Sequence, residues 1–225
     1  MRKSMLVVTL LTLVGSLLVA ESRVLVVMTE LLEERSAREP FIAKQVMSAL
    51  EEAGFTPVPA SANGHLVLAD GGATIPVLPL DEVEIADYVG VIFPGQLNIF
   101  SPRPDINLRD PWPAEVALAQ AVAATGLPIA AQARRVKILA EAGVLIDRRY
   151  SYHVDPINDR FAWNRDARFR GAVYAGNDSV VQDRNVITAP FCHPGGGCQG
   201  GAEWSPEDYA RLDEFTNTFI AALRG

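Results

Sequence analysis

The sequence predicts an α/β domain in which a mostly parallel β-sheet is covered by helices on both faces, a three-layer sandwich. Three short runs, at residues 23–28, 88–93 and 128–131, are almost continuously apolar, which is typical of strands buried on both faces. Segments with helical spacing of apolar residues separate the runs, at residues 39–53 and 114–125. Strands that alternate with helices form parallel sheets of this kind.

The other elements complete this pattern. Gly54 ends the first helix, and residues 55–58 form the next strand. Residues 30–34 are expected to be a loop, and residues 63–79 a hairpin or short strands. Further short strands are expected at residues 150–153, 171–174, 179–181 and 186–188. The last helix begins at Ser205-Pro206, a capping residue followed by a first-turn proline, and runs to Leu223.

The chain passes abruptly from strand to helix within residues 128–142, and we expect a site there. A turn at residues 132–135 follows the apolar run, and the helical pattern then continues to Gly143. In open α/β sheets such turns lie at the carboxyl edge, where ligands bind. Several hydrolase-like folds place a nucleophile on this kind of elbow, but here the elbow residue is Ala133, which has no reactive atom.

Residues 1–22 are predicted to be a secretory signal peptide. The chain starts Met1-Arg2-Lys3, residues 5–20 are mostly apolar, and small residues near Ala20 suit cleavage. The alternatives are an uncleaved anchor or a buried strand, but a membrane span needs about 20 apolar residues. We therefore expect an exported protein, periplasmic or secreted, with residues 23–225 as a single domain and no membrane association after cleavage.

Charge and composition exclude several partners and cofactors. The formal net charge is -7 at pH 7, which argues against binding to nucleic acid. No glycine-rich phosphate loop follows the first apolar run, so we expect no nucleotide or flavin cofactor.

Cys192 and Cys198 are the only cysteines, and a Gly-rich segment separates them. In an oxidising compartment such a pair is predicted to form a disulfide. A metal site with His193 as third ligand is the alternative, but the spacing matches no familiar zinc pattern, and we predict no metal site. A free Cys192 beside His193 or His153 would instead be a relocated nucleophile.

Residues 128–145, 88–95 and 185–188 resemble the ThiJ/PfpI family of the class I glutamine amidotransferase-like superfamily, and the resemblance extends from Arg23 to Leu223. It implies a flavodoxin-like sandwich. Enzymes of this family carry Cys-His at the elbow, where this chain has Ala133-Arg134. Alanine supplies no thiolate, and arginine does not act as a base at ordinary pH. Thiol-dependent peptidase, amidotransferase, deglycase or glyoxalase activity is therefore not expected at this elbow.

The resemblance also implies a candidate pocket. It would be lined by Glu33, Gly95, Gln96, Ala133, Arg134 and His153. Gln96 replaces the second glycine of the family's Pro-Gly-Gly turn. Glu33, or Glu34 if the register slips by one, matches the acid that contacts the thiol in relatives, and His153 matches a histidine near the thiol in some members. A solvated loop carboxylate and a structural histidine are the alternatives for Glu33 and His153. If both face the elbow, Arg134 could pair with Glu33 and fill the space of a substrate.

These observations favour an exported, non-catalytic domain that binds a small ligand or a partner protein at a degenerate pocket. The alternative is a hydrolase- or lyase-type enzyme that uses Cys192, or acid–base chemistry by Glu33 and His153. The resemblance also implies a homo-oligomer, for which residues 97–113 would supply an interface or a lid.

Overall fold

We analysed a computed structural model of the chain, which describes residues 22–28, 31–32, 42–68, 74–95, 111–153, 156–157, 166–190 and 206–225. Only the backbone is described for residues 31–32 and 67–68. The predicted signal peptide therefore lies outside the described residues. So do the predicted disulfide and most of the loop at residues 97–113.

A seven-stranded sheet forms the centre of the molecule. Its strands, in spatial order, are β11 (Val181–Asp183), β12 (Val186–Ala189), β8 (Ile129–Gln132), β7 (Gly90–Phe93), β1 (Arg23–Val27), β3 (Thr56–Ser61) and β6 (Leu78–Pro79). Every neighbouring pair is parallel except β11 with β12. The carboxyl ends of the parallel strands consequently meet at one edge, which contains the end of β8.

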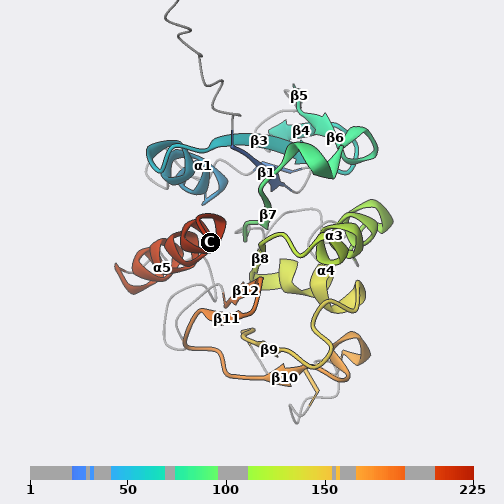
Figure 1. Cartoon of the computed structure of the whole chain (residues 1–225), viewed down its shortest axis with the longest axis vertical. Coiled ribbons are helices and arrows are strands. Elements are labelled where there is room, and N and C mark those ends of the chain that lie inside the picture. Colours follow the sequence, from blue (N-terminus) through green and yellow to red (C-terminus); the bar gives the residue numbers. More distant parts are fainter. Residues whose placement is uncertain are drawn as a thin grey trace, which may run out of the picture.

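Helices cover both faces of this sheet, as predicted. Figure 1 shows α1 (Ile42–Glu52) and α5 (Pro206–Leu223) on one side, and α3 (Pro113–Thr125) and α4 (Val136–Glu141) on the other. Alternation along each strand divides the core between the two faces. On β1, Val24 and Val26 pack in the cluster that includes α1 and α5, whereas Leu25 and Val27 pack in the cluster that includes α3 and α4.

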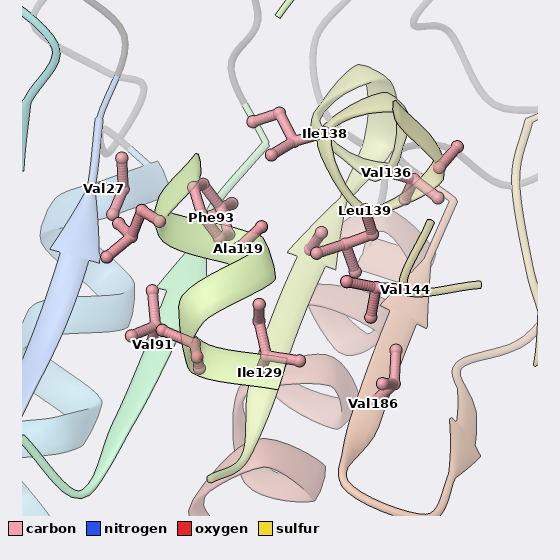
Figure 2. Close-up of a cluster of buried hydrophobic side chains, with 14 of the residues drawn as sticks. Val27, Val91, Phe93, Ala119, Ile129, Val136, Ile138, Leu139, Val144 and Val186 are labelled. Atoms are coloured by element: carbon pink, nitrogen blue, oxygen red, sulfur yellow. The ribbon is translucent and has the colours of Figure 1, made fainter. Parts of the chain in front are cut away.

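The core beneath α3 and α4 is built from aliphatic side chains of several strands. In Figure 2, Val91 and Phe93 of β7 and Ile129 of β8 lie beside side chains of α3 and α4. All three are at most 1% exposed. Burial of side chains of this size stabilises the fold by about 1.5–3 kcal/mol each, so this cluster holds α4 against the sheet.

Two small sheets lie outside the central one. β2 (Leu31–Leu32), β4 (His65–Leu68) and β5 (Thr74–Pro76) form a three-stranded sheet, and β9 (Arg149–Tyr150) pairs with β10 (Val173–Tyr174). The prediction for residues 63–79 is confirmed. The loop predicted at residues 30–34 is wrong at Leu31–Leu32, because the backbone there pairs in parallel with β4. Two adjacent leucines show no period-2 pattern, so the sequence carries no strand signal at this point.

The helix ends follow local backbone rules. Gly54, with φ 88°, follows α1, and Gly143, with φ 71°, follows α4. Both conformations are left-handed and suit glycine. The last helix begins at Pro206 and ends at Leu223, as predicted. No helix within the described residues is long and apolar enough to span a membrane.

Candidate functional site

The elbow predicted at Ala133 is a sharp strand-to-helix turn. β8 ends at Gln132, a single 3-10 turn (Ala133–Arg135) follows, and α4 starts at Val136. Ala133 has φ 55° and is 5% exposed. A left-handed conformation costs an L-residue about 1–2 kcal/mol, so the surrounding structure holds the turn in a strained shape. The strain persists although the residue carries no reactive atom.

The end of β7 is joined to the elbow by a side chain. Gly95 donates its backbone N–H to Oε1 of Gln132 at 3.2 Å. Gln132 is completely buried, and its Nε2 has no acceptor within the described part of the chain. The backbone donor at Gly95 is thus already occupied, and a buried amide donor beside Ala133 is left unsatisfied. We expected Gln132 only as a turn residue, and it is instead the last buried residue of β8.

A buried ion pair lies beneath the other side of the elbow. Arg135 Nη1 is 2.9 Å from Glu115 Oε1, and Nη2 donates to the Val27 carbonyl oxygen at 3.3 Å. The guanidinium carbon is 5.5 Å from the centroid of the Phe93 ring. Although 2.9 Å is short, Oε1 has no hydrogen bond of acceptable angle, so we treat this contact as a charge pair rather than a directed bond.

Glu115 has a second role at the start of α3. Its Oε2 accepts the backbone N–H of Trp112 at 3.2 Å, which caps the helix. The elbow, the start of α3 and the end of β1 are therefore held together by Arg135 and Glu115. The sequence offers a signal for half of this arrangement, the capping pattern Trp112-Pro113-Ala114-Glu115. It offers none for its partner Arg135 in the elbow turn.

Arg134 points the other way. It is exposed, and Lys137 of α4 follows it three residues later. Desolvation, Arg134 and Lys137, in that order, lower the pKa of His153 to about 4. His153 keeps an exposed surface, and the two neighbouring cations lower its pKa independently of burial. At neutral pH the imidazole is uncharged.

Lys137 is held by an acid from a later segment. Its Nζ is 3.6 Å from Asp166 Oδ2, and Asp166 Oδ1 accepts a 2.7 Å hydrogen bond from Arg168 Nε. Desolvation lowers the pKa of Lys137, and the Asp166 carboxylate opposes that change. The pKa of Asp166 is lowered, because its hydrogen bonds and charge contacts with Arg168 outweigh desolvation.

Ser151 is a structural residue. It is fully buried, its backbone N–H donates to Thr188 Oγ1 at 2.9 Å, and its hydroxyl donates to the Thr188 carbonyl oxygen at 2.9 Å. A hydroxyl committed to a backbone carbonyl is not poised to attack a substrate. The serine closest in sequence to His153 therefore ties β9 to β12.

The predicted site residues fall into three groups. Gly95 and Ala133 meet at the carboxyl edge through Gln132. Arg134 and His153 influence each other at the surface. Glu33, Glu34, Gln96, Cys192, His193 and Cys198 lie outside the described residues. Among the residues described, no group of three or more potential metal ligands is found.

A separate groove of about 610 Å³ runs between the start of α3 and the 3-10 turn η5 (Ala167–Phe169). Pro113, Val116 and Ala117 form one wall, and Glu141, Asp166 and Arg168 contribute to the other. None of the predicted site residues lines it. No residue of the elbow turn at 133–135 lines it either.

Several solved structures share this architecture. The chain is similar to a ThiJ/PfpI domain protein from Brachyspira murdochii, with 19% identity and a TM-score of 0.60, over 91% of this chain and 98% of that one. It is also similar to a DJ-1 superfamily protein from Salmonella typhimurium, solved as a cysteine-to-alanine mutant. There the identity is 19%, the TM-score 0.59 and the coverage 91% of each chain.

A third similar structure is an isoprenoid biosynthesis protein with an amidotransferase-like domain from Ehrlichia chaffeensis. It has 12% identity and a TM-score of 0.60, over 90% of this chain and 99% of that one. The chain therefore has the ThiJ/PfpI and DJ-1 fold, the class I glutamine amidotransferase-like fold. No protein-family model and no curated protein sequence matches the chain.

Proposed function

We propose that this chain is an exported, non-catalytic protein of ThiJ/PfpI-like fold that binds a small ligand at a degenerate elbow. The observation that carries the proposal is Ala133, which occupies the strained elbow position without a nucleophile. Acyl or carbonyl chemistry at such a turn requires a thiolate or an alkoxide. A methyl side chain leaves the architecture of the site but removes its covalent step.

The state of the backbone donors agrees with this proposal. Catalysis at an elbow needs free N–H groups aimed at the oxyanion that develops. The Gly95 N–H instead donates to Gln132 Oε1 at 3.2 Å. A substrate oxygen would first have to displace that buried amide. Binding of a ligand without turnover does not require a free N–H at Gly95.

The neighbouring side chains offer little acid–base chemistry. His153 has a pKa of about 4, so it is a weak base at neutral pH. The hydroxyl of Ser151 is committed to the Thr188 carbonyl oxygen. An arginine side chain such as that of Arg134 has donors only and no acceptor, so it does not serve as a general base.

An enzyme with a relocated nucleophile is the competing proposal. It would use Cys192, or acid–base chemistry by Glu33 with His153. The uncharged imidazole of His153 is the one described feature in its favour, because a neutral ring can accept a proton.

The test is turnover by the purified chain. We expect no conversion of methylglyoxal and no hydrolysis of a peptide amide, before or after reduction and alkylation of Cys192 and Cys198. Turnover that alkylation abolishes would establish the Cys192 enzyme, which Cys192→Ser would confirm. Turnover that survives alkylation but not His153→Gln would establish acid–base catalysis. Either result would refute the non-catalytic proposal.

Export and self-association are parts of the same proposal and are measured separately. Export with removal of residues 1–22 predicts a mature amino terminus near Arg23, which sequencing of the exported protein determines. A homo-oligomer predicts a mass in solution that is a multiple of the chain mass, which light scattering measures.

A further inference from the structure

Two polar side chains buried on the α5 face of the sheet carry nitrogen donors without hydrogen-bond partners. Gln132 is fully buried, and Arg211 of α5 is 7% exposed. Gln132 Nε2 and Arg211 Nε and Nη1 find no acceptor in the part of the chain that the structure describes. Leaving a buried donor unpaired costs about 1–3 kcal/mol, and more when the group is charged. We therefore expect a ligand atom to accept hydrogen bonds from these donors.

Both side chains belong to the same layer. On β8, Ala130 packs in the cluster with α1 and α5, whereas Ala131 packs in the opposite cluster. Because side chains alternate along a strand, Gln132 points to the α5 side, as Ala130 does. On α5, Arg211, Phe215 and Phe219 are spaced by four residues and all are buried, so they form one stripe facing the sheet.

Their heights along the strands also match. Phe219 and Leu223, near the end of α5, lie against Gly90, the first residue of β7. Arg211 precedes Phe219 by two helical turns, or about 12 Å of rise. Because Ala131 pairs with Phe93, Gln132 lies one residue beyond the end of β7, at about 13 Å from the level of Gly90. Arg211 and Gln132 thus reach the carboxyl edge together.

The described residues around Gln132 do not satisfy its free donor. Gln132 is paired in register with Ala189 of β12, and it is bonded to Gly95 and followed by Ala133. The bond from Gly95 N–H fixes the orientation of the amide, because it must receive a carbonyl oxygen, and so Nε2 is the free end. None of these three neighbours has a side-chain acceptor.

Asp208 is the buried acid of α5, and it lies one turn before Arg211. It is buried and has contacts of its own. Among the described residues no ion pair joins it to Arg211, whose Nε and Nη1 remain without hydrogen bonds. An arginine that is buried, positively charged and unmatched on two of its nitrogens is typical of a site for an oxyanion.

We propose that Gln132 and Arg211 bind the carboxylate group of a small organic acid between the end of β8 and the first turns of α5. A carboxylate supplies acceptors for Gln132 Nε2 and for Arg211, and its single charge matches one guanidinium. A doubly charged phosphate suits this site less well than a carboxylate does, because the Asp208 side chain lies one turn away and would repel the larger negative charge more strongly. This inference rests on the proposed ligand-binding function and names the class of ligand.

Acetate is the probe. We expect sodium acetate to raise the unfolding temperature of the full chain, saturably, relative to sodium chloride at equal ionic strength and pH 7. At ten times the Kd the folding equilibrium shifts about eleven-fold, which corresponds to about 3–5 °C for a chain of this size. Acetamide, which has no charge, and phosphate, which has too much, are expected to give smaller shifts.

Arg211→Met and Gln132→Met should remove the shift caused by acetate while leaving the chain folded in chloride. An unpaired buried charge destabilises the ligand-free fold, so Arg211→Met should unfold at an equal or higher temperature without acetate. Arg170→Met is the matched control: Arg170 is exposed, and this variant should keep the full acetate shift. Arg211→Lys keeps the charge but not the guanidinium, and should weaken the shift.

The inference is overturned if acetate gives no saturable shift in the unmodified chain. It is also overturned if the shift persists in both Arg211→Met and Gln132→Met. A larger shift with phosphate than with acetate would reject the carboxylate in favour of another anion. These results are independent of the turnover assay, so loss of this site would leave the non-catalytic proposal intact, and turnover would leave the anion site intact.

Discussion

The buried pair of Arg135 and Glu115 should be the most sensitive polar interaction of the described structure. The two side chains are 10% and 2% exposed, and their charged atoms are 2.9 Å apart. Removing one partner of such a pair leaves the other charge buried, which typically costs about 3–5 kcal/mol. A domain has about 5–15 kcal/mol of total stability, so the loss is a large fraction of it.

Glu115→Gln isolates the charge from the helix cap. Glutamine retains an oxygen for the Trp112 N–H, so the start of α3 keeps its hydrogen bond. We expect the midpoint of thermal unfolding to fall by about 6–20 °C. Chemical denaturation at constant pH gives the free energy of unfolding directly.

A double-mutant cycle separates the pair from its surroundings. Arg135→Met should cost about as much as Glu115→Gln, because it leaves a buried carboxylate. The double variant should be more stable than the sum of the single losses predicts, by at least about 2 kcal/mol, since it buries no unmatched charge.

The exposed pair of Arg23 and Asp87, at 3.7 Å, is the control, and Asp87→Asn should cost about 1 kcal/mol or less. A loss below about 1 kcal/mol for Glu115→Gln would refute the reasoning.

Two further predictions concern the elbow and its neighbour. Ala133→Gly should leave stability unchanged or raise it by up to about 1 kcal/mol, because glycine accepts φ 55° without strain, whereas Ala130→Gly in the adjacent strand should destabilise. Equal losses in both variants, measured by denaturant unfolding, would show that the turn is unstrained. The pKa of His153 is lowered from 6.5 to about 4 in the folded chain. The unfolded chain therefore binds a proton at His153 more readily than the folded chain does, so protonation favours unfolding. The stability linked to His153 is consequently lost as pH falls from about 6.5 to 4. His153→Gln should flatten the decline across that window, and an NMR titration of His153 with a midpoint near 6.5 would contradict the prediction.

Much of the fold could be predicted from the sequence because its signals are local. Apolar runs without alternation mark β1, β7 and β8, and glycines in left-handed conformations mark the ends of α1 and α4. The elbow could be predicted for the same reason, since a strand pattern changes to a helix pattern within four residues. β2 was missed because two leucines form a strand only by pairing with β4.

The contacts of the polar residues at the elbow were decided by the tertiary structure. The sequence presents Arg134 and Arg135 as equivalent neighbours, and only Arg134 was placed in the candidate pocket. In the structure Arg134 is exposed and Arg135 is buried against Glu115, because consecutive residues of a 3-10 turn point about 120° apart and only one can face α3.

Gln132 and Arg211 illustrate the same limit. A glutamine at a turn and an arginine in an amphipathic helix are ordinarily solvated, so the sequence gives no reason to bury them. Their burial follows from the height at which α5 crosses the carboxyl edge and from the alternation of β8. The sequence by itself thus determined the layers, the elbow and the missing nucleophile. Packing between distant segments decided which polar side chains are buried near the elbow. Their burial and their hydrogen-bond partners depend on contacts between segments that are far apart in the sequence, and no local pattern encodes such contacts.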